Sequence, residues 1–157
     1  MTDVNMLSVT PAAHMMGEDE EETDQLHALL HEATEYMQSF RWCHGIVESY
    51  FGLGIGGILA VFLFRIDSPP PVDEWLWAVV GDIPPCYLVT EAAPTPLAAL
   101  QTYCDVMQDW VTAVRNKWPL DELAPVNAEP TERNAAALDS RIAFVRTQII
   151  PLFSSPA

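Results

Sequence analysis

Two histidines one helical turn apart are the first candidates for chemistry in this sequence of 157 residues. His27 and His31 stand at positions i and i+4, so on a helix both imidazoles would face the same side and could bind one metal ion. No third ligand follows at a regular spacing, and the internal glutamate of the zinc protease motif is absent. A pair of partly exposed surface histidines is therefore the favoured interpretation, and neither a metal nor a cofactor is expected.

A cysteine–histidine pair and an aspartate pair are the candidates for catalysis. Cys43 and His44 are adjacent, but neighbours on a strand point to opposite faces, so they could not act there as nucleophile and base. Asp105 and Asp109 share one face of a predicted helix, where paired carboxylates can do acid–base chemistry if they are buried. Solvated aspartates are the favoured interpretation. Because GxSxG, SxxK and GxxxxGK[ST] motifs are also absent, the residues do not support enzymatic activity.

The longest apolar run, from Ile46 to Ile66, contains the only glycine cluster and allows three interpretations. A transmembrane helix needs about 20 apolar residues, but the charge-free part, Ser49 to Phe64, is shorter and holds four glycines. Gly52, Gly54 and Gly57 match the dinucleotide-binding pattern GxGxxG, which requires a helix to follow. The segment that follows, ILAVFLFRI, has instead the β-branched and aromatic composition of a strand.

A β-hairpin is therefore the favoured interpretation of this run, with strands at 46–53 and 58–66 joined by a glycine turn. The second strand is apolar on both faces, which is typical of a central strand covered on both sides. The segments EWLWAVVGD and CYLVT predict two further strands after it. Two successive hairpins predict a four-stranded, mainly antiparallel sheet.

Three amphipathic segments predict helices around this sheet. The first covers residues 23–41 and has a threonine as its N-cap. The second begins with Pro96 at the first helical position and ends before Pro119. The third covers residues 131–150 and ends before Pro151. The predicted fold class is α+β, in the order α-β-β-β-β-α-α, with the N-terminal helix and the two C-terminal helices packed on the sheet.

Charge divides the chain into a predicted tail and a predicted domain. Residues 1–22 show no helical or strand periodicity and end in GEDEEE, whose like charges resist compaction, so an acidic disordered tail is expected there. Residues 23–153 are expected to form a single α+β domain, because a chain of this length can bury a core without disulfides or metal. The whole chain has 22 acidic residues against seven Lys and Arg, a net charge of −15.

This negative charge excludes some partners and favours others. It repels nucleic acid and anionic membranes, and it favours a basic protein as the partner. The N-terminal sequence has no apolar signal segment. Cys43, Cys86 and Cys104 are odd in number and lack CxxC spacing, which favours reduced thiols over a disulfide framework. A cytoplasmic protein is therefore expected.

Two function hypotheses from different classes remain. The first is a non-enzymatic protein-binding domain, such as an acidic inhibitor, that engages a cationic partner through its carboxylates. The second is a small-molecule-binding or weakly catalytic domain with a pocket between the sheet and the C-terminal helices. Part of the sheet face that carries Trp75 and Trp77 could also form a homodimer interface. The candidate binding residues are Trp75, Trp77, Tyr103, Asp105, Asp109 and Trp110.

In size and composition the chain is similar to bacterial immunity proteins and to other small inhibitors of basic toxins or nucleic-acid-binding enzymes. The similarity covers the acidic surface, the single predicted domain and the lack of catalytic motifs. It implies an immunity-type role and a basic protein as the target. No motif of a particular family carries the similarity, so it is an analogy of general character.

Overall fold

The computed structural model describes residues 2–154. Met1, which belongs to the predicted tail, and residues 155–157 lie outside the described part. The chain divides into two compact units, residues 1–99 and residues 100–157, and each is described by itself. The single domain predicted for residues 23–153 stays a prediction.

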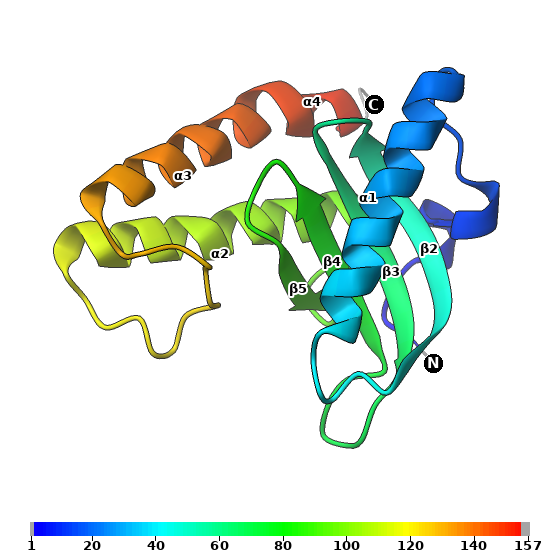
Figure 1. The fold of residues 1–157 in the computed structure, drawn as a ribbon, viewed down its shortest axis with the longest axis horizontal. Coiled ribbons are helices and arrows are strands. Elements are labelled where there is room, and N and C mark those ends of the chain that lie inside the picture. Colours follow the sequence, from blue (N-terminus) through cyan, green and yellow to red (C-terminus); the bar gives the residue numbers. More distant parts are fainter. Residues whose placement is uncertain (1, 155–157) are drawn as a thin grey trace. The chain divides into compact units, whose positions relative to one another are not determined.

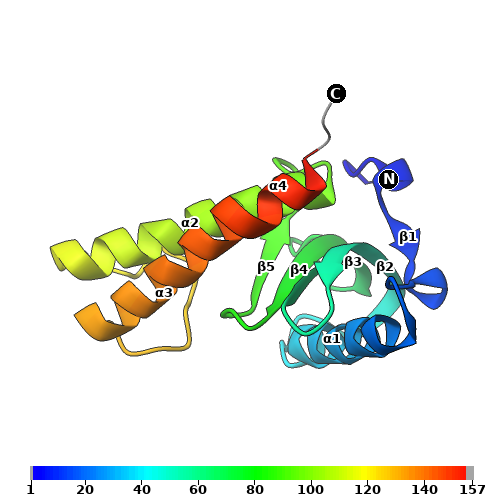
Figure 2. The same ribbon diagram turned by 90° about the horizontal axis from the view of Figure 1, so that it is seen from above.

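The first unit is built on an antiparallel sheet of five strands in the order β1-β2-β3-β4-β5. Helix α1 lies along one face of this sheet (Figures 1 and 2). The strands are β1 (Thr10–Pro11), β2 (Gly45–Ile55), β3 (Leu59–Asp67), β4 (Trp75–Gly81) and β5 (Cys86–Val89), and the helices of the first ninety residues are η1 (Met6–Ser8), η2 (Ala12–His14) and α1 (Glu20–Gln38). The α+β class, the antiparallel sheet and the central hairpin of β2 and β3 are confirmed.

The number of strands differs from the four that the sequence predicts. The additional strand, β1, lies in the segment predicted to be a disordered tail, and it pairs with β2 through Thr10 opposite Phe51 and Pro11 opposite Tyr50. Two residues, one of them proline, show no strand periodicity, so only the long-range pairing defines this strand. Val4 and Met15 of the same segment are buried, at 6% and 3% exposure.

Helix α1 also starts earlier in the chain than the sequence predicts. The predicted N-cap was Thr23, but the helix begins at Glu20 with Asp19 as N-cap, whose carboxylate accepts a hydrogen bond from the Glu22 backbone N–H at 2.8 Å. The side chain of Thr23 instead accepts one from the Gly17 N–H at 2.9 Å. The acidic run belongs to the helix because carboxylates are stabilised by the partial positive charge at a helix N-terminus.

The core of the first unit lies between α1 and the sheet. Strand β3 is central, as predicted, with β2 and β4 as neighbours and all side chains from Leu59 to Phe64 buried. One group of buried side chains joins the helix to the inner face of the sheet; it includes Leu26, Leu29, Ala33, Met37, Phe62, Phe64, Leu76, Ala78 and Val80. The aromatic rings of Phe40, Trp42 and Tyr87 extend it, with centroids 4.8 to 5.1 Å apart.

The second unit holds most of helix α2 (Pro96–Asn116), then α3 (Glu132–Phe144), the π-helical turn η3 (Val145–Ile149) and α4 (Ile150–Phe153). Proline at the first position of α2 and Thr131 as the N-cap of α3 agree with the sequence patterns. Arg115 of α2 is bonded to Glu132 and Asp139 of α3, both at 3.2 Å.

Pro151 does not end the last helix, contrary to the prediction. The α-helix ends at Phe144, continues as a π-helical turn, and begins again at Ile150 with proline in its first turn. Proline is tolerated there because the N–H that it lacks would have no partner inside the new helix. Among the described residues no helix is both long and apolar enough to cross a membrane.

Candidate functional site

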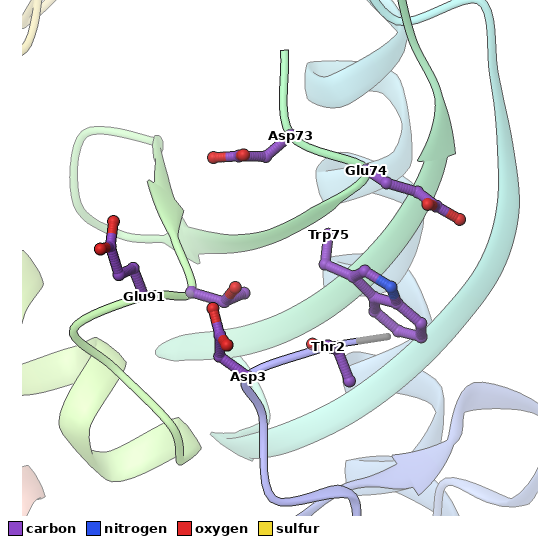
Figure 3. A pocket seen from close by; sticks show the side chains of 7 residues that line it. Thr2, Asp3, Asp73, Glu74, Trp75 and Glu91 are labelled. Atoms are coloured by element: carbon purple, nitrogen blue, oxygen red, sulfur yellow. The ribbon is translucent and has the colours of Figure 1, made fainter. Parts of the chain in front are cut away.

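An acidic hollow in the first unit, which we call the acidic pocket, lies where β4 begins and β5 ends. Its volume is about 180 Å³. Figure 3 shows the Trp75 ring on one side of the hollow and the carboxylates of Asp3, Asp73 and Glu91 on the other. The lining residues are Thr2, Asp3, Asp73, Glu74, Trp75, Thr90 and Glu91.

The pairing of β4 with β5 brings two of the three lining segments together. Leu76 pairs with Val89 in antiparallel register. Residues 73–75, at the start of β4 and just before it, therefore lie beside residues 90–91, which follow β5. Since Trp77 pairs with Leu88 and side chains alternate along a strand, Trp75 and Thr90 point to the same face of the sheet, opposite the face that α1 covers.

The N-terminal segment supplies the third side of the acidic pocket. The backbone N–H of Asn5 donates to the carbonyl of Pro94 at 2.8 Å. Val4 is buried next to this bond, and its N–H donates to the Thr2 hydroxyl at 3.2 Å. These contacts hold Asp3 beside the start of β4, which is far from it in the sequence.

The four carboxylates of the acidic pocket differ in their charge partners. Glu74 is bonded to Arg65, which also binds Glu48, and Figure 3 shows its carboxylate directed away from the hollow. The hydrogen bonds from Tyr50 and Arg65 lower the pKa of Glu48. No basic side chain of the described residues pairs with Asp3, Asp73 or Glu91. Three of the four carboxylates of the pocket therefore have no basic partner among residues 2–154.

Trp75 offers an aromatic surface next to these charges. The ring is half-buried, and Tyr50 lies on the neighbouring part of the sheet with its centroid 6.0 Å away. An aromatic face attracts a cation within about 6 Å of its centroid, and tryptophan does so most strongly. A hollow that combines this ring with three carboxylates is suited to an organic cation.

Thr90 is the only buried polar residue among those that the structure describes, at 7% exposure. Its hydroxyl makes no hydrogen bond to a described residue, whereas every fully enclosed polar side-chain atom of the described part has a partner. The hydroxyl is therefore open to the acidic pocket that the residue lines. A buried hydroxyl without a protein partner is costly unless water or a ligand bonds to it.

Of the predicted binding residues, only Trp75 lines the acidic pocket. Trp77 is completely buried, and its indole N–H donates to the Ala93 carbonyl at 2.8 Å. Tyr103 and Trp110 are buried on α2, at 1% and 3% exposure. The two aspartates of the same helix are exposed, and the first of them, Asp105, pairs with Arg146 at 2.9 Å; the second is Asp109. The hypothesis of a small-molecule pocket stays a prediction.

The histidine pair on α1 is exposed, as the sequence indicates. His31 contacts the carboxylate of Glu35 at 2.9 Å, one turn further along the helix. No three metal-binding side chains of residues 2–154 come close enough to share one ion.

The three cysteines are free and buried. Burial raises the pKa of the Cys86 thiol from about 9 to about 11. At a pH between these two pKa values, the thiol of the unfolded chain loses its proton and the thiol of the folded chain keeps it. The free energy of unfolding should therefore fall by about 1.4 kcal/mol between pH 7 and pH 10. Urea titrations of the wild type and of Cys86→Ala across this range test the effect. The variant should lose that part of the slope; an unchanged slope would contradict it.

The first unit is an α+β sheet structure with one helix on its inner face, and its outer face carries an acidic pocket. Comparison with protein-family models, with curated proteins and with solved structures gives no match.

Sequence reasoning missed Asp3, Asp73, Thr90 and Glu91. One signal for part of the set exists: the segments DEW and TE flank predicted strands that are expected to pair. A carboxylate at each of two neighbouring strand ends indicates local negative charge. Nothing in the sequence around Asp3 indicates that it joins them.

Proposed function

We propose that this protein is a non-enzymatic binding domain, of the acidic inhibitor or immunity type, that engages a basic protein partner through its carboxylates. The acidic pocket carries the proposal, because a tryptophan ring and three carboxylates that have no basic partner in the described part of the chain line the same hollow. Such an arrangement lowers the free energy of a bound cationic side chain through both charge and aromatic contact.

The remaining charge distribution supports a cationic partner. Arg65, Arg115 and Arg146 are already held by carboxylates of the chain itself. With 22 acidic and seven basic residues in all, the chain has a net charge of −15. The resulting negative field accelerates the approach of a basic protein and weakens as salt is added.

The test is capture of partners from the source organism, followed by direct binding. The immobilised full chain should retain a protein rich in Lys and Arg at low salt, and the purified pair should bind at least about tenfold more weakly when ionic strength rises from 0.05 to 0.5 M. A partner that is acidic, or whose affinity does not change with salt, would contradict the proposal, as would the absence of any partner.

A matched pair of variants separates the acidic pocket from the general field. The pocket variant is Asp3→Asn, Asp73→Asn, Glu91→Gln, and the control is Asp121→Asn, Glu122→Gln, Glu129→Gln in the loop before α3. Both raise the net charge by three. The pocket variant should weaken binding of the captured partner at least about tenfold, and the loop variant only slightly. Equal losses would show that the pocket is not the binding site.

A further inference from the structure

We infer that the acidic pocket receives an arginine side chain, with its guanidinium stacked on Trp75 and hydrogen-bonded by the surrounding oxygens. The inference rests on the proposed function and names the group that the pocket recognises. The structural basis is the hollow of about 180 Å³, the ring at its side, the three carboxylates that no described basic side chain pairs with, and the Thr90 hydroxyl that opens into it.

The spacing of the carboxylates favours an organic cation over a metal ion. In residues 2–154 no three carboxylate, histidine or cysteine side chains converge on one point that could hold a metal. The oxygens of Asp3, Asp73 and Glu91 are thus spread around the hollow. Calcium needs six to eight oxygens at about 2.3–2.6 Å, and an indole ring supplies none. A planar cation can meet separated oxygens with separate N–H groups.

The shape of the cation follows from the ring and the hydroxyl. A guanidinium group has five N–H donors in one plane and is more weakly hydrated than an ammonium group, so it stacks on an aromatic face while its edge donates hydrogen bonds. An ammonium group has three donors and no flat surface. The Thr90 hydroxyl, which lines the pocket and makes no hydrogen bond to a described residue, can accept one further N–H.

The negative charge around the ring also favours a charged group over a neutral group of the same shape. Glu74 is paired with Arg65, which it shares with Glu48, and the other three carboxylates of the pocket have no basic partner among the described residues. A neutral ureido group has the shape of a guanidinium group but no charge, and it should gain little from this site. Arginine, lysine and citrulline peptides therefore separate shape from charge.

The experiment measures the indole N–H resonance of Trp75 in the full chain by NMR. The resonance is identified by its loss in Trp75→Phe. The probes are acetylated and amidated Gly-Gly-Xaa-Gly-Gly peptides in which Xaa is arginine, lysine or citrulline. The arginine peptide should shift this resonance in a saturable way, with a dissociation constant at least about threefold below that of the lysine peptide. Citrulline should cause no saturable shift.

Two variants test the named contacts. Thr90→Val keeps the side-chain shape and should weaken the arginine peptide about tenfold, and Glu91→Gln should weaken it by a similar factor. Glu122→Gln, in the loop before α3 and outside the lining of the pocket, should leave it unchanged. An arginine peptide that shifts Trp75 no more than the lysine peptide, or equal affinity in Thr90→Val, would overturn the guanidinium assignment.

A further probe distinguishes a wrong guanidinium assignment from a wrong proposed function. The acetylated and amidated peptide Lys-Gly-Lys-Gly-Lys-Gly-Lys offers general positive charge. Salt-sensitive binding of this peptide without selective binding of arginine would overturn the guanidinium assignment and leave the proposed function standing. Binding of none of the cationic probes would overturn both.

Discussion

A Phe62→Ala variant is expected to lose about 3–5 kcal/mol of unfolding free energy. Phe62 is completely buried in the central strand β3, and its ring lies 5.9 Å from the ring of Phe51 and 6.3 Å from that of Phe64. Removal of the ring leaves a cavity between the sheet and α1, because neighbours in a packed core relax only partly. Urea denaturation followed by tryptophan fluorescence measures the loss.

The matched control is Phe144→Ala. This phenylalanine ends α3 and is 42% exposed, so its removal should change the unfolding free energy by at most about 0.5 kcal/mol. A loss below about 1 kcal/mol in Phe62→Ala would show that the side of the sheet facing α1 is not packed as described. The contrast between the two variants separates burial from residue type.

Gly81→Ala is expected to lose about 3 kcal/mol of unfolding free energy. Gly81 ends β4 with φ of +136°, and a methyl group there would stand 2.3 Å from the Ile58 carbonyl oxygen and 2.6 Å from the Leu59 Cα. Both neighbours are backbone atoms, so the clash can be relieved only by moving the strand. We combine a backbone strain of about 1–2 kcal/mol with about 1–3 kcal/mol for the steric clash.

Two other glycines separate these contributions. Gly57 in the turn between β2 and β3 has φ of +78°, but its nearest neighbouring atom would be 3.8 Å away, so Gly57→Ala should lose only the strain, about 1 kcal/mol. Gly45 has neither a positive φ nor a neighbour within 4 Å, and its substitution should be neutral. Thermal or urea unfolding of the three alanine variants should follow this order, and any other order would contradict it.

The central hairpin shows what local patterns can predict. The run from Ile46 to Ile66 was assigned to two strands and a glycine turn because its residues prefer extended structure and its glycines allow a tight turn. The apolar side chains on both faces of β3 indicated a central position, which the sheet order confirms. In the same way, Pro96 and Thr131 marked two helix starts through chemistry confined to a single turn.

The N-terminal segment shows where such patterns fail. Its like charges suggested a tail, yet Asp19 and the glutamates after it begin α1, because a helix N-terminus stabilises negative charge. Strand β1 depends on a partner some forty residues away. The prediction of a tail considers the repulsion among the acidic residues but not their attraction to the positive end of the helix dipole.

By itself, the sequence determined the α+β class, the central hairpin and the net negative charge of the chain. Only the tertiary structure decided which carboxylates from distant parts of the chain meet in one pocket. Asp3, Asp73 and Glu91 are distant in the chain and meet because β4 pairs with β5 and the segment before β1 bonds to Pro94. Strand register and long-range backbone bonds are cooperative properties of the folded chain, so no local pattern at those three residues could indicate that they form one pocket beside Trp75.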